Sequence, residues 1–443
     1  MKGNTVLKTP VRILIGLGFC ILLTITWVIA INSKSTAEKQ LVLINTASEL
    51  IDDGIYIRAV PLLEEAAGYI AAHTLTAENK LKTVYLALMD TRGFSRKYTT
   101  LLDKQMERHD AQPEVFMEAA VYYLSIAKLH EALNVLKSGI EKTRDVSLVT
   151  LYENSRYAYE TNRVSYDEVT AIYGQTIQVR QEGNWGIAHA DGSILIPCEY
   201  EKVSTFYEGR AVVMSEGAVF AVDRDNNRIA VPYEKIAGFK NLADGRIPLL
   251  VEGSWRRATG DFELGSYMFE DIGMYSGGYA AAKTNGSWGV IDLSTNWLIP
   301  PEYDEIIQDE LGRCYAQGAV FVRTGDRVYL IVNGNRIEDV YEDARPFTSE
   351  GYAAVKKNGK WGFIDKAGNV VIPFNFDDAL SFGQHLAAVK QGDYWGYISI
   401  YGHVVIDTIY YEAKSFSGGS APVLTERGWQ FITLLEYKKG ASL

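Results

Sequence analysis

Residues 358–373 read Asn-Gly-Lys-Trp-Gly-Phe-Ile-Asp-Lys-Ala-Gly-Asn-Val-Val-Ile-Pro, and most of the predicted architecture rests on this pattern. An apolar and aromatic run, a polar turn that contains glycine, and a second β-branched run predict two strands joined by a turn. Proline has no amide hydrogen to give to a β-ladder. We therefore expect Pro373 to end the second strand at the edge of a sheet.

The stretch recurs along the chain. In three copies a proline follows a tryptophan at the same distance: Trp185 and Pro197, Trp288 and Pro300, and Trp361 and Pro373. With weaker copies included, the tryptophan position recurs eight times, at Trp185, Val219, Trp255, Trp288, Val328, Trp361, Trp395 and Trp429. Successive copies lie roughly 33–40 residues apart, and a period of this size indicates a repeat architecture. The longest interval separates Trp288 from Val328.

Each unit carries runs for three short strands, so residues 173–443 predict an all-β array of about eight three-stranded repeats. No unit can bury its aromatic face alone, and stacked neighbours must complete the core. The array can curl into a propeller-like ring or remain an open superhelix, and the period fits both.

The repeated tryptophan and glycine have a packing explanation. Trp361 and Phe363 fall on one face of the predicted strand, and Gly362 and Ile364 on the other. A glycine beside the tryptophan leaves room for a neighbouring backbone or ring. Because burial of aromatic side chains dominates core energetics, we interpret these positions as scaffold. They are Trp185, Gly186, Trp288, Gly289, Trp361, Gly362, Trp395, Gly396 and Trp429.

The pattern Trp-Gly-[Phe/Tyr/Val]-Ile-Asp, then Gly, then Val-Ile-Pro, then Tyr or Phe with Asp or Glu, resembles the bacterial WG (KWG) repeat over residues 173–443. Two units depart most: Trp255-Arg256-Arg257 lacks the glycine, and Val328-Tyr329 lacks both signature residues. The resemblance implies an all-β repeat domain of interaction type. It brings no general enzymatic activity and no residue-level site.

The N-terminus carries a candidate membrane anchor. Residues 1–12 hold three basic residues and no acidic one, and the segment 13–31 is apolar and carries no charge. Its length suits a transmembrane helix, whereas the apolar region of a cleaved signal peptide, the main alternative, is usually only about 7–15 residues. We expect a single-pass, uncleaved anchor, a cytoplasmic segment 1–12 and an extracytoplasmic body.

Residues 37–165 have few glycines and apolar residues at helical spacing. Ala59, Tyr98 and Ala132 occupy similar helix positions at comparable intervals along the chain. The copy at residues 119–133 is similar to a tetratricopeptide repeat, in which paired helices pack small and aromatic residues at such intervals. An irregular helical bundle is the alternative. The chain is thus expected to be a multidomain protein: a transmembrane helix, α-helical hairpin repeats and an all-β array.

Composition and motifs argue against several functions. The net charge of −11 disfavours a nucleic-acid partner, because phosphate binding needs a basic face. Three cysteines, Cys20, Cys198 and Cys314, follow no disulfide or zinc spacing. No GxSxG, HExxH or phosphate-loop motif occurs. We expect no catalytic residues, no cofactor and no metal.

Residues 223–234 come near the spacing of a calcium-binding loop, with Asp223 first and Glu234 last. The sixth position is Arg228, where the sharp turn of such a loop requires glycine. The segment also aligns with the ordinary turn after Asp365. We predict a solvated hairpin turn.

These observations favour an interaction or scaffold protein of the cell envelope with a protein or peptide partner. Its alternatives are a binder of cell-wall glycan, an envelope hydrolase with unrecognised carboxylates, and a structural spacer. Partner contacts are expected where the units disagree, around Trp255-Arg256-Arg257 and in the long interval between Trp288 and Val328. Glycan contacts are expected at aromatics outside the repeat positions: Trp297, Tyr401 and Tyr411.

Overall fold

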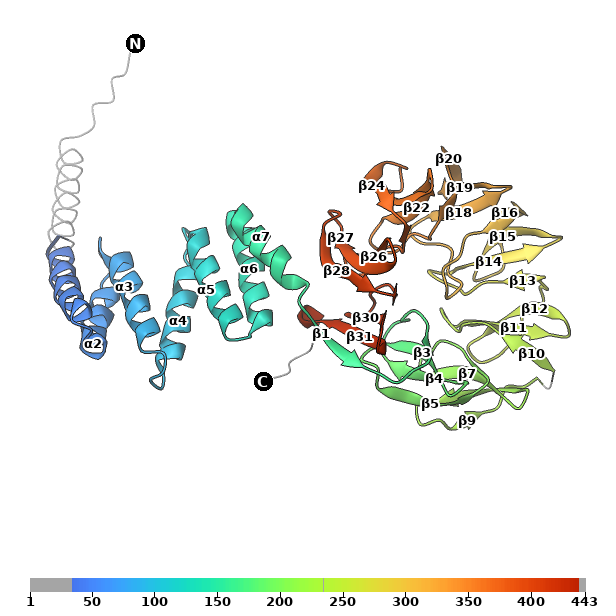
Figure 1. Cartoon of the computed structure of the whole chain (residues 1–443), viewed down its shortest axis with the longest axis horizontal. Coiled ribbons are helices and arrows are strands. Elements are labelled where there is room, and N and C mark those ends of the chain that lie inside the picture. The colour runs from blue at the N-terminus through green and yellow to red at the C-terminus, as the bar shows by residue number, and fades with distance from the viewer. Residues whose placement is uncertain (1–33, 234, 438–443) are drawn as a thin grey trace, which may run out of the picture. The chain divides into compact units, whose positions relative to one another are not determined.

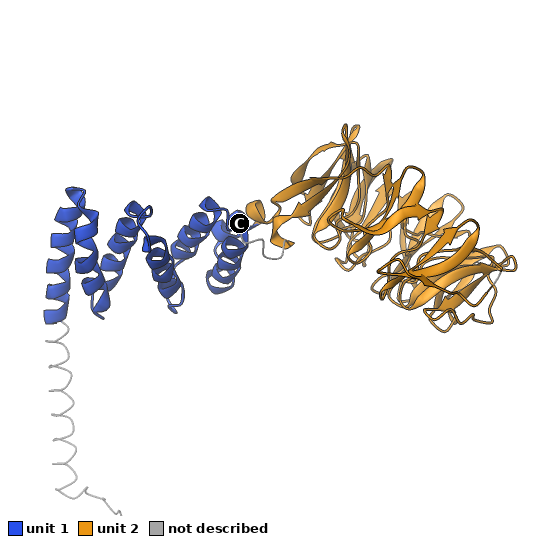
Figure 2. Cartoon of the chain, turned by 90° about the horizontal axis from the view of Figure 1, so that it is seen from below, with its two compact units in different colours: residues 1–152 blue, residues 153–443 orange. Residues whose placement is uncertain are grey.

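The computed structural model describes residues 34–233 and 235–437. The chain divides into two compact units, unit 1 (Met1–Tyr152) and unit 2 (Glu153–Leu443) (Figure 2). The predicted membrane span, residues 13–31, lies outside the described residues. Within the described ranges, no helix is both long enough and apolar enough to cross a membrane.

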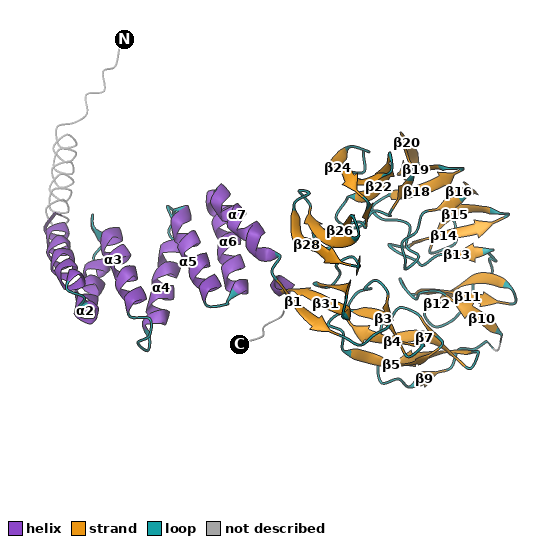
Figure 3. Ribbon diagram, viewed as in Figure 1, coloured by secondary structure: helices purple, strands orange, loops and turns teal. Residues whose placement is uncertain are grey.

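Unit 1 is a succession of helices, drawn purple in Figure 3. The first covers residues 34–52. The others are α2 (Tyr56–Gly68), α3 (Thr74–Ala87), α4 (Phe94–Met106), α5 (Pro113–Ser125), α6 (Leu129–Thr143) and α7 (Val146–Arg156). The positions picked from the sequence, Ala59, Tyr98 and Ala132, are at most 1% exposed. The helical spacing therefore predicted which face of α2, α4 and α6 packs into the core.

The described residues of unit 2 form eight antiparallel sheets. Sheet 1 holds β2 (Glu168–Val169), β3 (Thr176–Gln181), β4 (Asn184–His189) and β5 (Ile194–Tyr200); sheet 2 holds β6 (Lys202–Val203), β7 (Arg210–Ser215), β8 (Ala218–Asp223) and β9 (Arg228–Ile229). Sheet 3 holds β10 (Ile236–Phe239), β11 (Arg246–Val251) and β12 (Ser254–Thr259); sheet 4 holds β13 (Asp271–Ile272), β14 (Tyr279–Thr284), β15 (Ser287–Asp292) and β16 (Trp297–Tyr303).

The second half repeats this plan. Sheet 5 holds β17 (Glu305–Ile306), β18 (Ala319–Thr324), β19 (Arg327–Val332) and β20 (Asn335–Tyr341); sheet 6 holds β21 (Asp343–Ala344), β22 (Ala353–Lys357), β23 (Lys360–Ile364) and β24 (Val370–Phe376). Sheet 7 holds β25 (Asp378–Ala379), β26 (Leu386–Gln391), β27 (Tyr394–Ser399) and β28 (Val404–Tyr410); sheet 8 holds β29 (Glu412–Ala413), β30 (Ser420–Thr425), β31 (Gly428–Leu434) and β1 (Tyr159–Arg163).

The expectation of three strands per unit was wrong for most of the sheets. Counted over residues 153–233 and 235–437, seven of the eight have four strands, and the sheet of β10, β11 and β12 has three. The additional strand is two residues long, as in Asp378–Ala379, and is too short to show an alternating pattern. It also lies at the end of one sequence repeat but pairs in the sheet of the next, so each repeat links two neighbouring sheets.

The eight sheets form a closed ring. Sheet 8 takes its outer strand, β1, from the start of unit 2, where Tyr159 pairs with Leu434 and Arg163 with Gln430. An apolar core then joins sheet 8 back to sheet 1, with Phe431 and Trp429 against Val179 and its neighbours. The array is therefore an eight-bladed β-propeller and not an open superhelix. In Figure 1, β18, β19 and β20 follow one another outward from the centre of the ring, as do β3, β4 and β5.

Strand β1 lies inside the segment 37–165 that was expected to be helical. The helices end at Arg156, and residues 159–163 form the strand. Four of its five side chains are exposed, because it is the outermost strand of its sheet. A sequence without alternating apolar residues gave no sign of a strand at this place.

The glycine beside each tryptophan allows close contact between two strands. In sheet 6 the pairs Phe363–Ile372 and Trp361–Phe376 are separated by a bulge in the outer strand β24. A Cβ atom on Gly362 would lie 2.8 Å from the carbonyl oxygen of Ile372. The equivalent distances at Gly186, Gly289 and Gly396 are 2.5, 2.4 and 2.6 Å. The bulged strand therefore crosses directly over each of these glycines.

Pro373 does not end its strand, as the sequence had suggested. Strand β24 continues to Phe376, and the proline lies exposed within the bulge of this outermost strand. A bulge on an edge strand tolerates proline because no partner there needs its amide hydrogen. The predicted position at the edge of a sheet is confirmed.

The segment that begins at Asp223 forms a hairpin turn. The Asp223 Oδ1 atom accepts hydrogen bonds from the backbone N–H groups of Asp225 and Asn227, both at 2.9 Å. Asp365 accepts the same two bonds from Ala367 and Asn369. The aspartate of the repeat is thus a turn residue, and the predicted solvated turn is confirmed.

Substituting Gly362 with alanine should destabilise unit 2. Because the added methyl group would overlap the Ile372 carbonyl group, we expect the free energy of unfolding to fall by about 1–3 kcal/mol. Denaturant unfolding followed by tryptophan fluorescence measures this, since every tryptophan except Trp27 lies in unit 2. Gly238→Ala is the control, because its nearest neighbour is 3.7 Å away. Equal unfolding midpoints for Gly362→Ala and Gly238→Ala would show that the close approach of the Ile372 carbonyl group does not require glycine at position 362.

Candidate functional site

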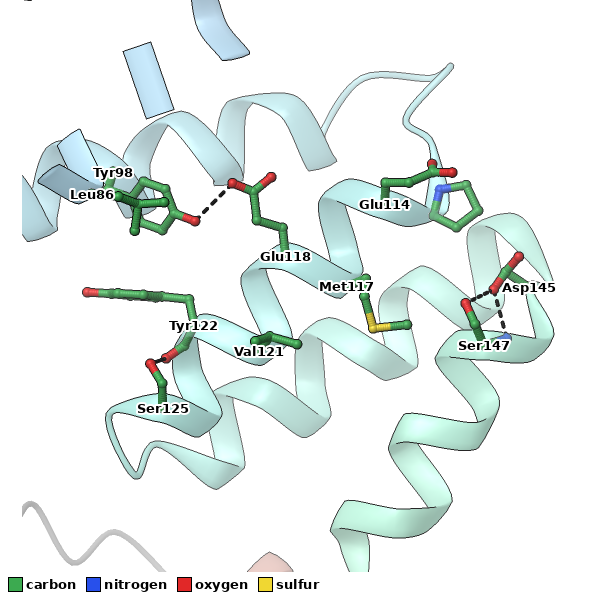
Figure 4. A pocket seen from close by; sticks show the side chains of 11 residues that line it. Leu86, Tyr98, Glu114, Met117, Glu118, Val121, Tyr122, Ser125, Asp145 and Ser147 are labelled. Atoms are coloured by element: carbon green, nitrogen blue, oxygen red, sulfur yellow. Dashed lines mark hydrogen bonds between the residues drawn. The ribbon is translucent and has the colours of Figure 1, made fainter. Parts of the chain in front are cut away.

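Unit 1 has a hollow of about 560 Å³ beside α5 (Figure 4). Helices α3, α4 and α5 line it together with the first residues of α7. The lining residues are Leu86, Tyr98, Pro113, Glu114, Met117, Glu118, Val121, Tyr122, Ser125, Asp145 and Ser147. We call this hollow the α5 groove.

Helix α5 presents opposite faces to the core and to the groove. Val115, Phe116, Ala119 and Ala120 are buried, and they recur at the spacing of one helix face. The groove-lining residues of α5 follow the same spacing on the other face, from Pro113 to Ser125. One amphipathic helix therefore both holds unit 1 together and forms the floor of the groove.

A polar network fixes the wall of the groove. The Tyr98 hydroxyl group donates a 2.9 Å hydrogen bond to Glu118, which also forms an ion pair with Lys82. Burial, and then the neighbouring Glu118 carboxylate, raise the pKa of Tyr98, so its hydroxyl group remains a donor at neutral pH. Below it, Arg108 holds the fully buried carboxylate of Glu78 with bonds of 2.6 and 2.7 Å. These contacts tie α3, α4 and α5 together.

The surface offered by the groove is apolar with an acidic margin. Val121 and Leu86 are 51% and 45% exposed. Glu114 and Asp145 stand at one end of the groove in Figure 4, and neither has a cationic partner among the described residues. Asp145 accepts hydrogen bonds from Ser147 instead. An apolar floor beside unneutralised carboxylates suits a ligand that carries both aliphatic and basic groups.

Unit 2 has a second hollow, of about 680 Å³, at the centre of the ring. The loops that follow the two-residue strands of six sheets line it, and we call it the central cavity. The loop of sheet 5 is unusual: residues 307–318 separate β17 from β18, whereas only residues 204–209 separate β6 from β7. This insertion accounts for the long interval between Trp288 and Val328.

The inserted loop closes part of the ring centre. Its Leu311 is 4% exposed and packs with Ala171, Ala243 and Met274, which come from three other sheets. Next to it, Glu310 forms a 2.8 Å ion pair with Lys414 of sheet 8. The loop therefore fills one side of the centre with apolar groups and leaves a charged cavity on the other.

The repeated tryptophans lie in the cores between sheets. Trp361, Trp395 and Trp429 are 3%, 9% and 5% exposed. Trp185 and Trp288 are partly buried against equivalent cores. Their rings are therefore largely unavailable to a partner.

The sequence also singled out Trp255-Arg256-Arg257, and all three residues are partly buried. The Trp255 ring packs against the core of sheet 4 and has the Lys240 Nζ atom 5.0 Å above it. Arg257 donates a 2.8 Å hydrogen bond to the Leu293 carbonyl oxygen. This segment thus lies largely between sheets 3 and 4.

The exposed aromatics do not form one surface. Trp297, Tyr401 and Tyr411 are 37%, 63% and 51% exposed. Trp297 begins β16 of sheet 4, whereas Tyr401 and Tyr411 flank opposite ends of β28 in sheet 7. Within the part of the chain that the structure describes, Tyr411 is the only one of the three with an exposed aromatic neighbour, Tyr394, and the ring centroids are 5.6 Å apart.

The sequence pointed to the long repeat interval as a contact region, but it did not reveal either hollow. The signals available were the helical copy at residues 119–133, which overlaps α5, and the long repeat interval, which contains the inserted loop. Neither signal shows which side chains face outward.

The family described as the WG containing repeat matches residues 185–217, 267–288, 288–309, 337–361, 361–395 and 395–429. The chain is a WG-repeat protein. All matched residues lie in unit 2, and most matched segments begin or end at a repeat tryptophan. The units at Trp255 and Val328, which depart most from the repeat, fall outside the matches.

Among solved structures, this WG-repeat protein is similar to the "AfRom2 CNH domain", at 9% identity and a TM-score of 0.30, over 54% of this chain and 96% of that one. It is also similar to a crystal structure of the eukaryotic initiation factor, at 11% identity and a TM-score of 0.39, over 61% and 84% of the two chains. At these values neither similarity indicates a function. No curated protein matches the chain.

Proposed function

We propose that this WG-repeat protein is a non-catalytic interaction scaffold of the cell envelope, with the α5 groove as its binding site for a protein segment. The observation that carries the proposal is the outward face of α5. A helix whose inner face is fully buried keeps Val121 and Met117 at the floor of a hollow with ample room for side chains. Apolar residues held open in this way mark interaction surfaces.

The arrangement of unit 1 supports this proposal. Small and aromatic residues at Ala59, Tyr98 and Ala132 lie buried at similar places in alternate helices, α2, α4 and α6. We take unit 1 to be a tetratricopeptide-like array, an architecture that presents extended surfaces to peptides. The Lys82–Glu118–Tyr98 network holds that face in one shape before a partner arrives, which reduces the ordering cost of binding.

The partner segment follows from the chemistry of the groove. Val121 and Leu86 offer aliphatic contacts, and Glu114 and Asp145 offer two carboxylates. A segment with aliphatic residues followed by lysine or arginine satisfies both. The charge pairs would guide recognition, and the apolar contacts would supply most of the affinity.

A photo-reactive residue in place of Val121 should capture this partner in cells that express the full chain. We expect one discrete adduct from position 121 and none from Ile70, which is fully exposed outside the groove. Glu114→Lys should reduce the adduct at least several-fold, because it reverses the charge at the acidic margin. Mass spectrometry of the adduct identifies the bound segment.

The matched control for the charge reversal is Glu49→Lys, on an exposed position of the helix over residues 34–52. It should leave the yield unchanged. An identical adduct from positions 70 and 121, or no adduct from position 121, would rule out the groove as the site. A yield insensitive to Glu114→Lys would rule out a basic partner.

We further propose that residues 13–31 anchor the chain as a single-pass membrane protein and that both units are extracytoplasmic. The uncharged apolar run and the basic residues before it support this orientation. An alkaline phosphatase fused after Leu443 should therefore be active, and a tag on residues 1–12 should remain on the full-length band. An inactive fusion would contradict export, and loss of the tag would indicate a cleaved signal peptide.

Glycan binding has less support. It requires aromatic side chains aligned along a sugar chain. Among the described residues, Tyr411 is the only one of Trp297, Tyr401 and Tyr411 whose ring pairs with another exposed aromatic ring, that of Tyr394, and Trp297 lies on another sheet. Hydrolysis would require two carboxylates at a set separation across a cleft. In the central cavity Glu310 and Glu412 share the Lys414 ammonium group, which disfavours the use of this pair for acid–base catalysis, so we favour the scaffold.

A further inference from the structure

The charges that line the central cavity are unbalanced. Its lining contains five carboxylates, from Asp309, Glu310, Glu350, Asp378 and Glu412. It contains three permanent cations, from Arg313, Arg345 and Lys414. His385 adds a positive charge near Glu350, at 2.8 Å, only when it is protonated. The cavity therefore carries an excess of negative charge at neutral pH.

Lys414 is shared between two carboxylates. Its Nζ atom lies 2.8 Å from Glu310 and 3.0 Å from Glu412, and its side chain is 14% exposed. One ammonium group cannot neutralise two carboxylates. The Glu310 side chain lines the cavity and is 38% exposed, so we expect part of its carboxylate to be accessible to a ligand. Burial raises the pKa of Glu310 even though Lys414 lowers it in part, as expected for an incompletely neutralised carboxylate.

The second cation of the cavity shows the same sharing. Arg345 lies 3.4 Å from Asp378 and 3.6 Å from Asp343. Its guanidinium group also stacks over the Trp361 ring, 4.5 Å from the centroid, which fixes it against the wall. Arg313 is occupied by Asp309 at 2.5 Å. The protein's own cations are thus held in place, and the remaining negative charge faces the space between them.

Aromatic side chains lie along the wall, but most are buried. Tyr315 is partly exposed, whereas Phe347, Phe382, Trp395 and Phe416 are at most 9% exposed. The carboxylates favour an organic cation because they attract positive charge, and the Tyr315 ring offers an apolar surface for its carbon chain. The volume of about 680 Å³ lies in the range of small-molecule sites and greatly exceeds that of a bare metal ion.

We propose that the central cavity of unit 2 binds a small organic cation, a primary amine with an aliphatic chain, through the Glu310 carboxylate and the partly exposed Tyr315 ring. The loop at residues 307–318 builds this site, since it both places Glu310 and closes the opposite side of the ring centre with Leu311. The site is separate from the α5 groove and is independent of the proposed scaffold role.

The probe is 1,5-diaminopentane, titrated calorimetrically into the full-length protein in detergent. We expect saturable binding of one molecule per chain. The uncharged 1,5-pentanediol and the anion glutarate, which have similar chain lengths, should not bind. Glu310→Gln keeps the shape of the side chain and should weaken diamine binding about tenfold, the usual effect of losing one charge-assisted hydrogen bond.

Glu263→Gln provides the matched control, because it makes the same change of charge at an exposed position outside the cavity. It should alter affinity less than twofold. The pH dependence gives an independent readout: since the pKa of Glu310 is raised, affinity should fall as acid protonates it, at a higher pH than for an ordinary glutamate. Glu310→Gln should abolish this fall.

Four results would overturn the proposal. They are no saturable diamine binding, equal binding of the diol, tighter binding of glutarate, and wild-type affinity in Glu310→Gln. The first three concern the class of ligand, and the last concerns the residue that holds it. A failure here leaves the α5 groove untouched, since that site lies in unit 1.

Discussion

The pairing of β1 with β31 is the contact on which unit 2 depends. Each sheet has apolar residues on both faces and covers them with its two neighbours, so an open row of sheets would leave one core exposed at each end. Strand β1 supplies the outer strand of the last sheet, and Phe431 then packs against Val179 of the first. Closure also protects sheet faces that would otherwise invite aggregation. The central cavity exists only because the ring is closed.

The periodic part of the fold could be predicted from sequence, and its closure could not. Trp361 and Gly362 recur for packing reasons that a single chain reveals, and the Cβ position of Gly362 confirms the close contact. The strand that closes the ring, β1, has the sequence Tyr-Glu-Thr-Asn-Arg. It shows no alternation of apolar residues, because it is an edge strand and most of its side chains face solvent. The prediction that Pro373 ends its strand was wrong because the proline lies in a β-bulge, and the sequence does not show where a bulge occurs.

Both proposed sites lie where the chain departs from a regular pattern. One lies at an irregular repeat interval, and the other lies on a helix face whose apolar residues are not covered. The repeat interval that is too long contains the loop with Glu310, which approaches Lys414 of sheet 8, far along the chain. Helix α5 carries apolar residues beyond those of its buried face. One of these additional apolar residues, Val121, is open to solvent. The sequence showed the irregular interval but not that its inserted loop lies at the ring centre. That position depends on the closure of the ring, which brings together residues far apart in the chain.

The most direct test of closure is a disulfide between β1 and β31. Arg163 and Gln430 are a pair without mutual backbone hydrogen bonds, since Val164 bonds to Trp429 and pairs alternate along the ladder. Cysteines at 163 and 430 should therefore cross-link under mild oxidation. Cysteines at 160 and 430 should not, because a displacement of three residues, about 10 Å, exceeds disulfide reach. A linked 163–430 peptide in mass spectrometry, absent from the 160–430 variant, is the predicted result. Absence of the 163–430 link, or equal linking in both variants, would contradict a closed ring.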